Sequence, residues 1–399
     1  MNFTYYAPTE VVFGDDAERH TAEMLRKYGA TKILLHYGGH SAQRSGLLDT
    51  LRRQLTDAGL EFIELGGVVP NPRLSKVREG IALCREHGVD FILAVGGGSV
   101  IDSAKAIGYG IPYQGDVWDI YARRAVPQTV VPVGVVLTIP AAGSEMSNSS
   151  VITAEGAQGE DLKRGYTNNL CRPRFAIMNP RLTFTLPPYQ TACGVVDILM
   201  HTLERYFTRG NDMALTDALA ESLMRTVIEC GPKVMADPHD YAARASIMWA
   251  SSLSHNDITA NRDLGDWATH GIEHELSGLY DVAHGAGLAA VWPAWALAVM
   301  DHAPERFTRL AVNVFGVPYD FTSTRNTALA GIRAAMDFFR RMGMPVNITE
   351  LLGGRPASDE DIDLMARKCT AGGPVGRLVR LDTAAVASIL HQANTNPLP

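Results

Sequence analysis

Short apolar runs alternate with helically spaced segments along the first part of the chain. The apolar runs lie at residues 32–37, 61–65, 91–95 and 131–138. Helical spacing of apolar residues occurs between them, at residues 47–58, 74–87 and 99–107. Runs that are apolar at nearly every position are typical of strands buried on both faces, and intervening helices favour parallel strand order. The pattern therefore predicts an α/β domain in which helices cover both faces of a parallel sheet.

The pattern changes after residues 186–188, where strand-like runs end and long amphipathic segments begin. These segments lie at residues 190–207, 214–229, 241–254, 267–278, 284–300, 304–314 and 324–342, with two more near the end of the chain. We therefore expect an α/β domain at residues 1–187 and an all-helical domain at residues 188–399. Two weaker strand-like segments, 4–13 and 151–178, are expected to add antiparallel strands to the first domain.

Composition excludes several classes of protein. A hydrophobic content of 46% and a charged content of 20% over 399 residues are typical of a globular chain with two cores. A net charge of -7 argues against binding to nucleic acid or to a membrane surface. Five cysteines without a CxxC pair fit free thiols better than a disulfide framework. The N-terminus has no secretion signal and no apolar stretch is long enough for a membrane span, so a cytoplasmic protein is expected.

A glycine-rich turn follows the third apolar run, in Gly96-Gly-Gly-Ser-Val-Ile-Asp-Ser-Ala-Lys105. Glycines let a backbone approach a ligand closely, and the helix that follows offers unpaired N–H groups to a phosphate. Ser99 is expected to cap this helix, with Asp102 as the acidic partner of a capping box. The turn stands at the carboxyl end of a central strand, where α/β sheets bind ligands. This position favours a phosphate cradle over a simple tight turn.

A second glycine turn, Tyr37-Gly-Gly-His-Ser41, also ends a strand and could hold the adenosine end of a dinucleotide. An acidic side chain at such a turn usually grips the ribose hydroxyls of NAD. No acidic residue stands at positions 37–41, whereas Ser41 and Arg44 could serve a 2′-phosphate. The turn therefore favours NADP(H) and leaves NAD(H) possible.

One carboxylate and four histidines in the helical region have metal-ligand spacing. Asp197 and His201 are four residues apart, and His270 and His274 repeat that spacing, so each pair projects from one helix face. His284 follows a short turn that can bring it back to the same point. The carboxylate with any three imidazoles suits a borderline divalent metal such as Zn(II) or Fe(II). Spacing alone does not choose three histidines among the four.

Other polar residues near these helices are weaker ligand candidates. Glu204 and Glu275 fit a place beside the ligands or at a helix end. Asp263, Asp266 and His255 lack the paired spacing.

Several motifs together resemble the iron-containing (group III) alcohol dehydrogenase family. They occur in family order over nearly the whole chain: the glycine turn at 96–105, Pro140-Ala-Ala-Gly-Ser-Glu145, Gly194-Val-Val-Asp197 with His201, His270-Gly-Ile-Glu-His274, and Ala283-His284-Gly285. Residues 37–41 and 266–270 look most like the butanol dehydrogenase branch, whose members are mostly NADPH-dependent aldehyde reductases. The resemblance implies a Rossmann-like N-terminal domain and a helical metal-binding domain, in a plan shared with dehydroquinate synthases.

The resemblance also implies roles for particular residues. A divalent metal, Fe(II) or Zn(II), would be held by Asp197, His201, His270 and His284, while His274 lines the substrate site. The residues implied for NADP(H) or NAD(H) are Gly38, Gly39, Ser41, Arg44, Asn71, Gly97, Gly98, Ser99, Asp102, Thr138, Ser147 and Lys163. One departure from the branch is His40, which stands where a third glycine is often found.

The expected activity is hydride transfer between NADP(H) and a short-chain primary alcohol or aldehyde, catalysed by a homodimer. The nicotinamide supplies the hydride, the metal polarises the carbonyl oxygen, and His274 is the candidate proton relay. The same fold could serve an NAD-linked alcohol dehydrogenase. A sugar-phosphate cyclase is disfavoured because the segments near the metal are rich in apolar residues such as Trp267 and Trp292 instead of basic ones. A non-catalytic nucleotide-binding protein has little support, because all expected ligands are present.

Overall fold

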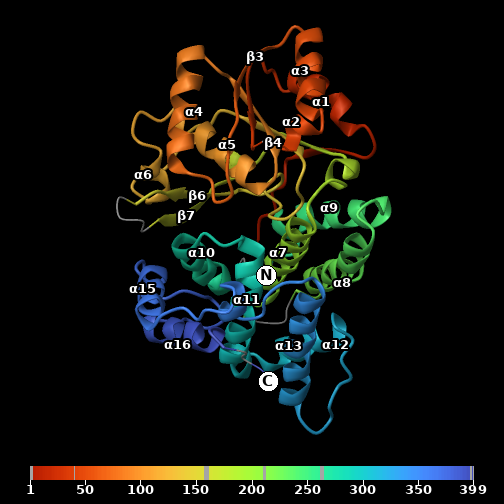
Figure 1. Ribbon diagram of the computed structural model, residues 1–399, viewed down its shortest axis with the longest axis vertical. Coiled ribbons are helices and arrows are strands. Elements are labelled where there is room, and N and C mark those ends of the chain that lie inside the picture. Colours follow the sequence, from red (N-terminus) through yellow and green to blue (C-terminus); the bar gives the residue numbers. More distant parts are fainter. Residues whose placement is uncertain are drawn as a thin grey trace. The chain divides into compact units, whose positions relative to one another are not determined.

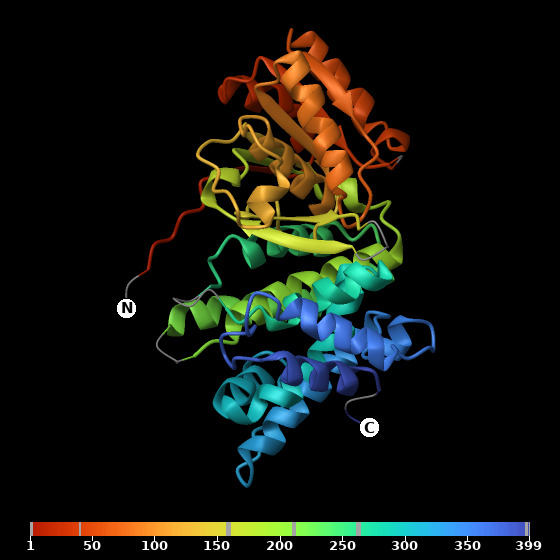
Figure 2. The ribbon, with the colours of Figure 1, turned by 90° about the vertical axis from the view of Figure 1, so that its left-hand side faces the viewer.

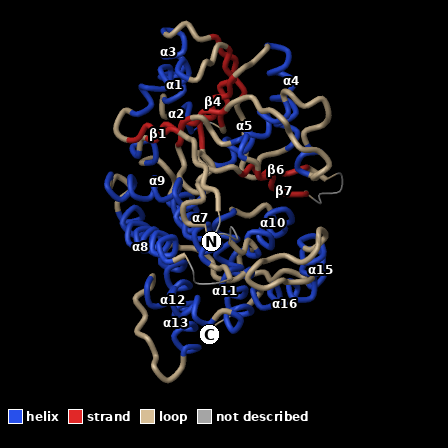
Figure 3. Tube along the Cα trace, turned by 180° about the vertical axis from the view of Figure 1, so that it is seen from behind, coloured by secondary structure: helices blue, strands red, loops and turns tan. Residues whose placement is uncertain are grey.

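The computed structural model describes residues 3–39, 41–156, 161–209, 213–260, 265–395 and 398. They form two compact units. The N-terminal unit comprises Tyr6–Leu186 with Ser251–Asn256, and the C-terminal unit comprises Met1–Tyr5, Pro187–Ala250 and Asp257–Pro399. Strands lie in the N-terminal unit, whereas the C-terminal unit is built from helices (Figure 3). Within the described ranges, no helix is both long and apolar enough to cross a membrane.

The N-terminal unit is built on a six-stranded parallel sheet (Figure 1). The strand order is β1-β8-β5-β4-β2-β3. The strands are β1 (Glu10–Phe13), β2 (Lys32–Tyr37), β3 (Glu61–Leu65), β4 (Phe91–Gly96), β5 (Val133–Leu137) and β8 (Phe175–Met178). The central strands β4 and β5 are buried along their whole length, which is why they are apolar at nearly every position.

Helices cover both faces of this sheet. The helices of the N-terminal unit are α1 (Thr21–Lys27), α2 (Ser41–Arg44), α3 (Leu47–Asp57), α4 (Leu74–His87), α5 (Gly98–Gly110) and α6 (Trp118–Tyr121), with 3₁₀ turns at Ala17–His20, Asn169–Cys171 and Pro180–Thr183. Leucines of α3 pack with Ile33, Leu35 and Leu93 on one face. On the other face α5 packs against β4 and β5 and also contacts α4. The expected α/β fold with a parallel sheet is confirmed.

Antiparallel strands were expected at residues 4–13 and 151–178, and the structure bears this out only for part of the second segment. β1 pairs with β8 in parallel, with Glu10 opposite Phe175, so the expectation was wrong for residues 4–13. β8 joins the sheet beside β5 as a parallel strand, and β1 extends it in the same direction. Antiparallel pairing occurs only between β6 (Ser149–Ala154) and β7 (Leu162–Thr167) among the described strands, and this pair forms a separate two-stranded sheet, coloured yellow in Figure 2.

The C-terminal unit consists of packed helices. They are α7 (Pro188–Tyr206), α8 (Ala214–Ala236), α9 (Tyr241–His255), α10 (Ala268–Tyr280), α11 (His284–Val299), α12 (Pro304–Asn313), α13 (Thr324–Arg341), α14 (Ile348–Leu351), α15 (Asp359–Cys369) and α16 (Thr383–Ala393), with a 3₁₀ turn at Met300–His302. The last turn of α9 groups with the N-terminal unit. Helix α11 is buried along most of its length and packs against both α7 and α10. These three helices carry the candidate metal ligands.

Candidate active site

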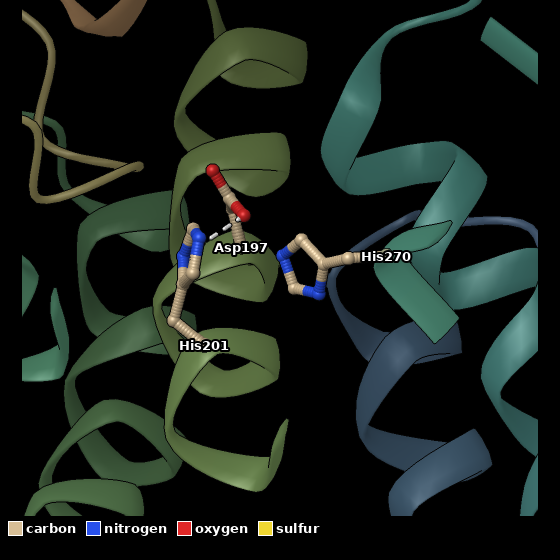
Figure 4. Close-up of side chains that lie close together, drawn as sticks. All are labelled: Asp197, His201 and His270. Atoms are coloured by element: carbon tan, nitrogen blue, oxygen red, sulfur yellow. Dashed lines mark ion pairs between the residues drawn. The ribbon is translucent and has the colours of Figure 1, made fainter. Parts of the chain in front are cut away.

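Asp197 and His201 lie one turn apart on α7 and face the same point. Their side chains are buried, and the Oδ1 of Asp197 is 3.2 Å from the Nδ1 of His201. His270, near the start of α10, points one ring nitrogen at this pair (Figure 4). One ligand atom from each of the three residues lies within 4.8 Å of the others. The structure therefore brings two helices together around three of the expected ligands.

His284 begins α11 and approaches the same group. Its Nε2 lies 3.9 Å from the Oδ1 of Asp197. The next residue, Gly285, packs directly on α7, where an added Cβ would overlap the backbone of Cys193. A larger side chain at 285 would therefore push α11 and its histidine away from α7.

His274 occupies a different position from the other imidazoles. It groups with Glu273 and His284, whereas Asp197, His201 and His270 form the other group of potential ligands. The ring centroids of His274 and His284 are 5.7 Å apart, and His274 is half-buried. It stands beside the imidazole cluster.

Two buried glutamates hold imidazoles of the cluster. The Oε1 of Glu204 accepts the Nδ1 of His270 at 3.0 Å. The Oε2 of Glu273 accepts the Nδ1 of His284. Glu273 was not among the residues singled out from the sequence. It stands three residues after His270 on one helix face, but that spacing does not indicate its contact with His284.

The donor set suits a divalent metal. Imidazole nitrogens and a carboxylate oxygen are ligands that suit Zn(II) and Fe(II), and catalytic centres of such metals keep a position open for substrate. The Nε2 of His270 is buried and has no hydrogen-bond partner among the described residues. A buried polar atom without a partner is costly, and a metal ion at this point would remove that cost. The residues present therefore fit a divalent cation.

Trp267 forms one wall beside the imidazoles. Its ring centroid is 5.1 Å from that of His270. The Arg205 guanidinium lies over the Trp267 ring, 4.6 Å from its centroid. Trp267 has a φ of 67°, which is a strained conformation for a bulky residue. Glu204 accepts its backbone N–H at 2.6 Å and supports this conformation.

The weaker ligand candidates lie in other roles. Asp266 accepts backbone N–H groups of Ala268, Arg377 and Leu378. The Nδ1 of His255 lies 2.6 Å from the carbonyl oxygen of Ala142, in the N-terminal unit. Glu275 lies 3.5 Å from the Nζ of Lys368. Asp263 lies outside the described residues.

The two glycine turns meet at a switch point of the parallel sheet. They follow β2 and β4, which are neighbouring strands. The helix after β2, α3, covers one face of the sheet, and the helix after β4, α5, covers the other. Crevices of this kind, at the carboxyl ends of the strands, are where open α/β sheets bind nucleotides. Gly38 and Gly39 follow β2, and Gly97 and Gly98 follow β4.

Close packing explains the glycines of the second turn. A Cβ at Gly97 would come within 2.8 Å of the Cβ of Ile139, and one at Gly98 within 3.0 Å of that of Ala142. Thr138 donates its backbone N–H to the carbonyl oxygen of Gly96 at 3.0 Å. The loop after β5 thus lies against the turn.

The expected capping box at Ser99 and Asp102 is wrong. Helix α5 begins at Gly98 with Gly97 as its N-cap, and no side chain caps it. The helix starts one residue early because Gly97, in an extended conformation, already supplies the first carbonyl acceptor to Val100 and Ile101. Ser99 therefore lies inside the first turn. Its backbone N–H is one of those that a helix start offers to an anion.

Asp102 instead faces the loop after β5. Its Oδ1 accepts the Ser144 hydroxyl at 2.5 Å and its Oδ2 accepts the Val151 backbone N–H at 2.9 Å. Burial raises the pKa of Asp102, although the nearby charge of Lys105 opposes that change. The Ser144 hydroxyl and the Val151 backbone N–H therefore hold this carboxyl group in place.

Lys105 is fully buried one turn beyond Asp102. Its Nζ donates to the carbonyl oxygens of Ser144, Ser147 and Ser149 at 2.7, 3.0 and 2.8 Å. Burial lowers the pKa of this lysine. The ammonium thus ties α5 to the loop that carries the expected cofactor residue Ser147.

The remaining expected cofactor residues lie on several different elements. Lys163 is buried in β7. Asn71 has a φ of 53°, in the left-handed region. Arg44 ends α2 and is exposed. Ser41 begins α2, and its side chain, like His40, lies outside the described part of the structure.

A parallel-sheet unit with paired glycine turns and a helical unit with a buried histidine and carboxylate group together define a metal-dependent nicotinamide oxidoreductase. The chain matches the iron-containing alcohol dehydrogenase model over residues 8–180. It matches the C-terminal model of the Fe-containing alcohol dehydrogenase family over residues 191–394. The chain therefore belongs to the iron-containing alcohol dehydrogenase family.

Relatives and solved structures agree with this membership. The chain is 41% identical to a probable NADH-dependent butanol dehydrogenase 1 of Bacillus subtilis, over 98% of this chain and 99% of that one. It is 34% identical to the NADPH-dependent aldehyde reductase YqhD of Escherichia coli, over 88% and 89%. The crystal structure of NADH-dependent butanol dehydrogenase A from Thermotoga maritima has a TM-score of 0.93 at 36% identity, covering 98% of each chain. The protein is an NAD(P)-dependent alcohol dehydrogenase that acts on an alcohol and aldehyde pair and uses a divalent metal.

Proposed function

We propose that the protein reduces short-chain aldehydes to primary alcohols with NADPH, at a divalent metal held by Asp197, His201, His270 and His284. The observation that carries the proposal is the convergence of these side chains from α7, α10 and α11. When bound, the metal supplies Lewis-acid stabilisation of the developing alkoxide, and the nicotinamide supplies the hydride. Fe(II) and Zn(II) both suit the ligand set.

The chain's own residues are assigned three tasks. The glycine turns at 38–39 and 97–99, with Thr138, Ser147, Asn71 and Lys163, bind the dinucleotide and leave room for its phosphates. Asp102, held by Ser144, orients the nicotinamide end. The Trp267 indole beside His270 favours an apolar substrate.

His274 is assigned the proton transfer. It stands beside His284 and is half-buried, so it can exchange protons with solvent. A His274→Ala variant should keep its metal and lose rate with an altered pH profile. An unchanged rate and pH profile would remove this assignment.

The preference for NADPH rests on the turn after β2. No acidic residue stands at positions 37–41 to grip a ribose, and exposed Arg44 can meet a 2′-phosphate. Glu64, which accepts the Tyr37 hydroxyl, is already paired with Arg52 at 2.7 Å. Relatives carry both names: the Bacillus protein is called NADH-dependent and the Escherichia protein NADPH-dependent.

A homodimer is also proposed. β1 is the outer strand of the six-stranded sheet, and Phe13 on it is 41% exposed. An apolar strand edge of this kind is commonly covered by a second copy. A monomeric mass in sedimentation at micromolar concentration would contradict this part of the proposal.

A paired assay tests the proposed reaction. Butanal reduction would be followed at the nicotinamide absorbance with NADPH and with NADH, before and after chelation and after reconstitution with Fe(II) or Zn(II). We expect metal-dependent oxidation of NADPH that is much faster than that of NADH. Preference for NADH would overturn the cofactor assignment and leave the reaction in place. Turnover that survives complete metal removal would overturn the metal site.

A further inference from the structure

Glu204 lies near the end of α7 and contacts α10 with both carboxylate oxygens. It is 2% exposed. Its Oε2 accepts the backbone N–H of Trp267 at 2.6 Å, and its Oε1 accepts the backbone N–H of His270 at 2.9 Å. The same Oε1 accepts the Nδ1 of His270 at 3.0 Å. One carboxylate therefore caps α10 and holds the imidazole that follows.

Glu273 makes the equivalent contact one turn further along α10. It is fully buried, its Oε2 contacts the Nδ1 of His284, and its Oε1 contacts the Ser277 hydroxyl. Gly287 of α11 packs on this carboxyl group, because a Cβ there would lie 2.9 Å from the Oε1 of Glu273. The carboxylate thus joins α10 to the start of α11.

These contacts determine the tautomer of two histidines. An ionised carboxylate only accepts hydrogen bonds, so the Nδ1 of His270 and of His284 must each carry the proton. The lone pair of a neutral imidazole then lies on Nε2. In both residues Nε2 is the atom directed at the cluster. It lies 3.9 Å from the Oδ1 of Asp197 in His284, and in His270 it has no hydrogen bond to any described residue.

We propose that Glu204 and Glu273 are positioning residues that build the metal site before the ion arrives. Each fixes one imidazole as a ligand that is neutral and aimed by Nε2, and each adds negative charge that strengthens the donor. The inference rests on the metal assignment of the proposed function. It adds that the affinity for the ion depends on two residues that do not touch it.

A purely structural role would have a different signature. Glu204 also caps α10, so its loss could reduce stability without any effect on the metal. Glutamine separates the two roles, because its amide oxygen can still accept a hydrogen bond while the charge is lost. Glu275→Gln is a matched control. Glu275 is a buried carboxylate on the same helix α10, and it pairs with Lys368.

The experiment measures Zn(II) affinity by chelator competition in metal-free protein without cofactor or substrate. We expect Glu204→Gln and Glu273→Gln to weaken binding by about tenfold to a hundredfold each. Glu275→Gln should bind as the wild type does. The visible spectrum of Co(II) in the site should change in both glutamine variants, because a neutral amide no longer adds negative charge to the imidazole donor.

Unchanged Zn(II) affinity in both glutamine variants would overturn the inference, as would a loss of thermal stability alone. Wild-type protein that binds no metal would overturn the inference together with the metal assignment. A Zn(II) affinity that falls in Glu204→Gln and Glu273→Gln but not in Glu275→Gln supports both the inference and the metal assignment. If a variant does not fold, nitrogen NMR of histidine-labelled, metal-free wild type tests the inference by showing which ring nitrogen carries the proton. Protonation at Nδ1 of His270 and His284 is expected, and protonation at Nε2 in either would overturn the inference.

Discussion

His36 is enclosed between β2, β3 and α5, and both of its ring nitrogens have partners. Its Nδ1 lies 2.9 Å from the carbonyl oxygen of Leu65, and its Nε2 lies 2.9 Å from the Ser103 hydroxyl. The carbonyl can only accept, so Nδ1 carries the proton and Nε2 accepts from Ser103. Burial lowers the pKa of His36 to about 4. The residue is therefore held neutral in the folded protein.

This shift predicts a loss of stability in mild acid. In the unfolded chain His36 takes up its proton near its ordinary pKa, above the folded value, so the unfolded state binds more protons between the two values. The stabilisation is complete above the unfolded pKa and is lost as the pH falls toward 4. From pH 7.5 to 5.0 the loss should be about 2 kcal/mol.

Urea unfolding of wild type and His36→Asn at both pH values measures this contribution. Asparagine can replace the Nδ1 hydrogen bond but does not titrate, so its stability should change less over the interval. Other histidines contribute equally to both proteins and cancel in the comparison. Equal pH dependence in the two proteins would show that the burial of His36 does not govern its protonation.

The proximity of residues in the candidate site was predictable where both residues lie on one helix at i and i+4. Asp197 and His201 are four residues apart on α7, and the structure brings them together as that spacing implied. The partner of His284 could not be found in this way, because Glu273 reaches it across the turn between α10 and α11. Ser99 was misassigned as a cap because an extended glycine can begin a helix without a side chain. The ligand and cofactor roles themselves stay predictions.

At the scale of elements, α5 and the loop after β5 are joined by one buried ammonium. Lys105 satisfies three carbonyl oxygens of residues 144–149, and the same loop holds Asp102 through Ser144. Ser252 from the end of α9 adds a 2.6 Å hydrogen bond to Glu145 of this loop. The loop is thus shaped from two sides before any ligand binds.

Replacing Lys105 with methionine should damage both stability and nucleotide binding. Three buried carbonyl groups lose their donor, which should cost at least about 3 kcal/mol of unfolding free energy. The loop beside the glycine turn should move, raising the Kd for NADPH about tenfold or more, which corresponds to about 1.4 kcal/mol. Zn(II) affinity should be unchanged, because the candidate ligands lie in the other unit.

Nucleotide fluorescence titration measures the Kd for NADPH, and chelator competition measures the affinity for Zn(II). Lys27→Met is a suitable control, because Lys27 is an exposed lysine of the same unit that pairs with Glu10. An unchanged Kd for NADPH in folded Lys105→Met would separate this lysine from the cofactor crevice.

The bounds of elements that end at a local stop signal such as glycine were predicted well, whereas the partners of strands and loops were predicted less well. The helix at 74–87 has the bounds of α4, because Gly88 ends it in a left-handed conformation. The direction of β1 was missed, because a four-residue strand carries no signal for the partner beside it. The contact of Ser252 with Glu145 joins residues more than a hundred positions apart, and no local pattern indicates it. The fold class depended on short apolar runs that alternate with helical segments, and it was confirmed.

At the scale of the molecule, the two candidate sites are built from different units. The glycine turns and the loop after β5 belong to the N-terminal unit, and the candidate metal ligands belong to the C-terminal unit. A ligand that binds only the folded form of one unit stabilises that unit by an amount set by its concentration relative to Kd. Metal and nucleotide should therefore act on separate unfolding transitions.

Calorimetry of metal-free protein tests this division. At about one hundred times Kd, either ligand should add about 2.7 kcal/mol to the unfolding free energy of its own unit. For units of this size, the corresponding transition should rise by about 5 to 10 °C. Zn(II) should move one transition and NADPH the other, and Glu273→Gln should reduce only the shift caused by Zn(II) at fixed Zn(II) concentration. If one ligand moved both transitions equally, the two sites would not belong to separately unfolding units. If NADPH moved the transition that Zn(II) moves and no other, the assignment of the nucleotide to the glycine turns would be wrong.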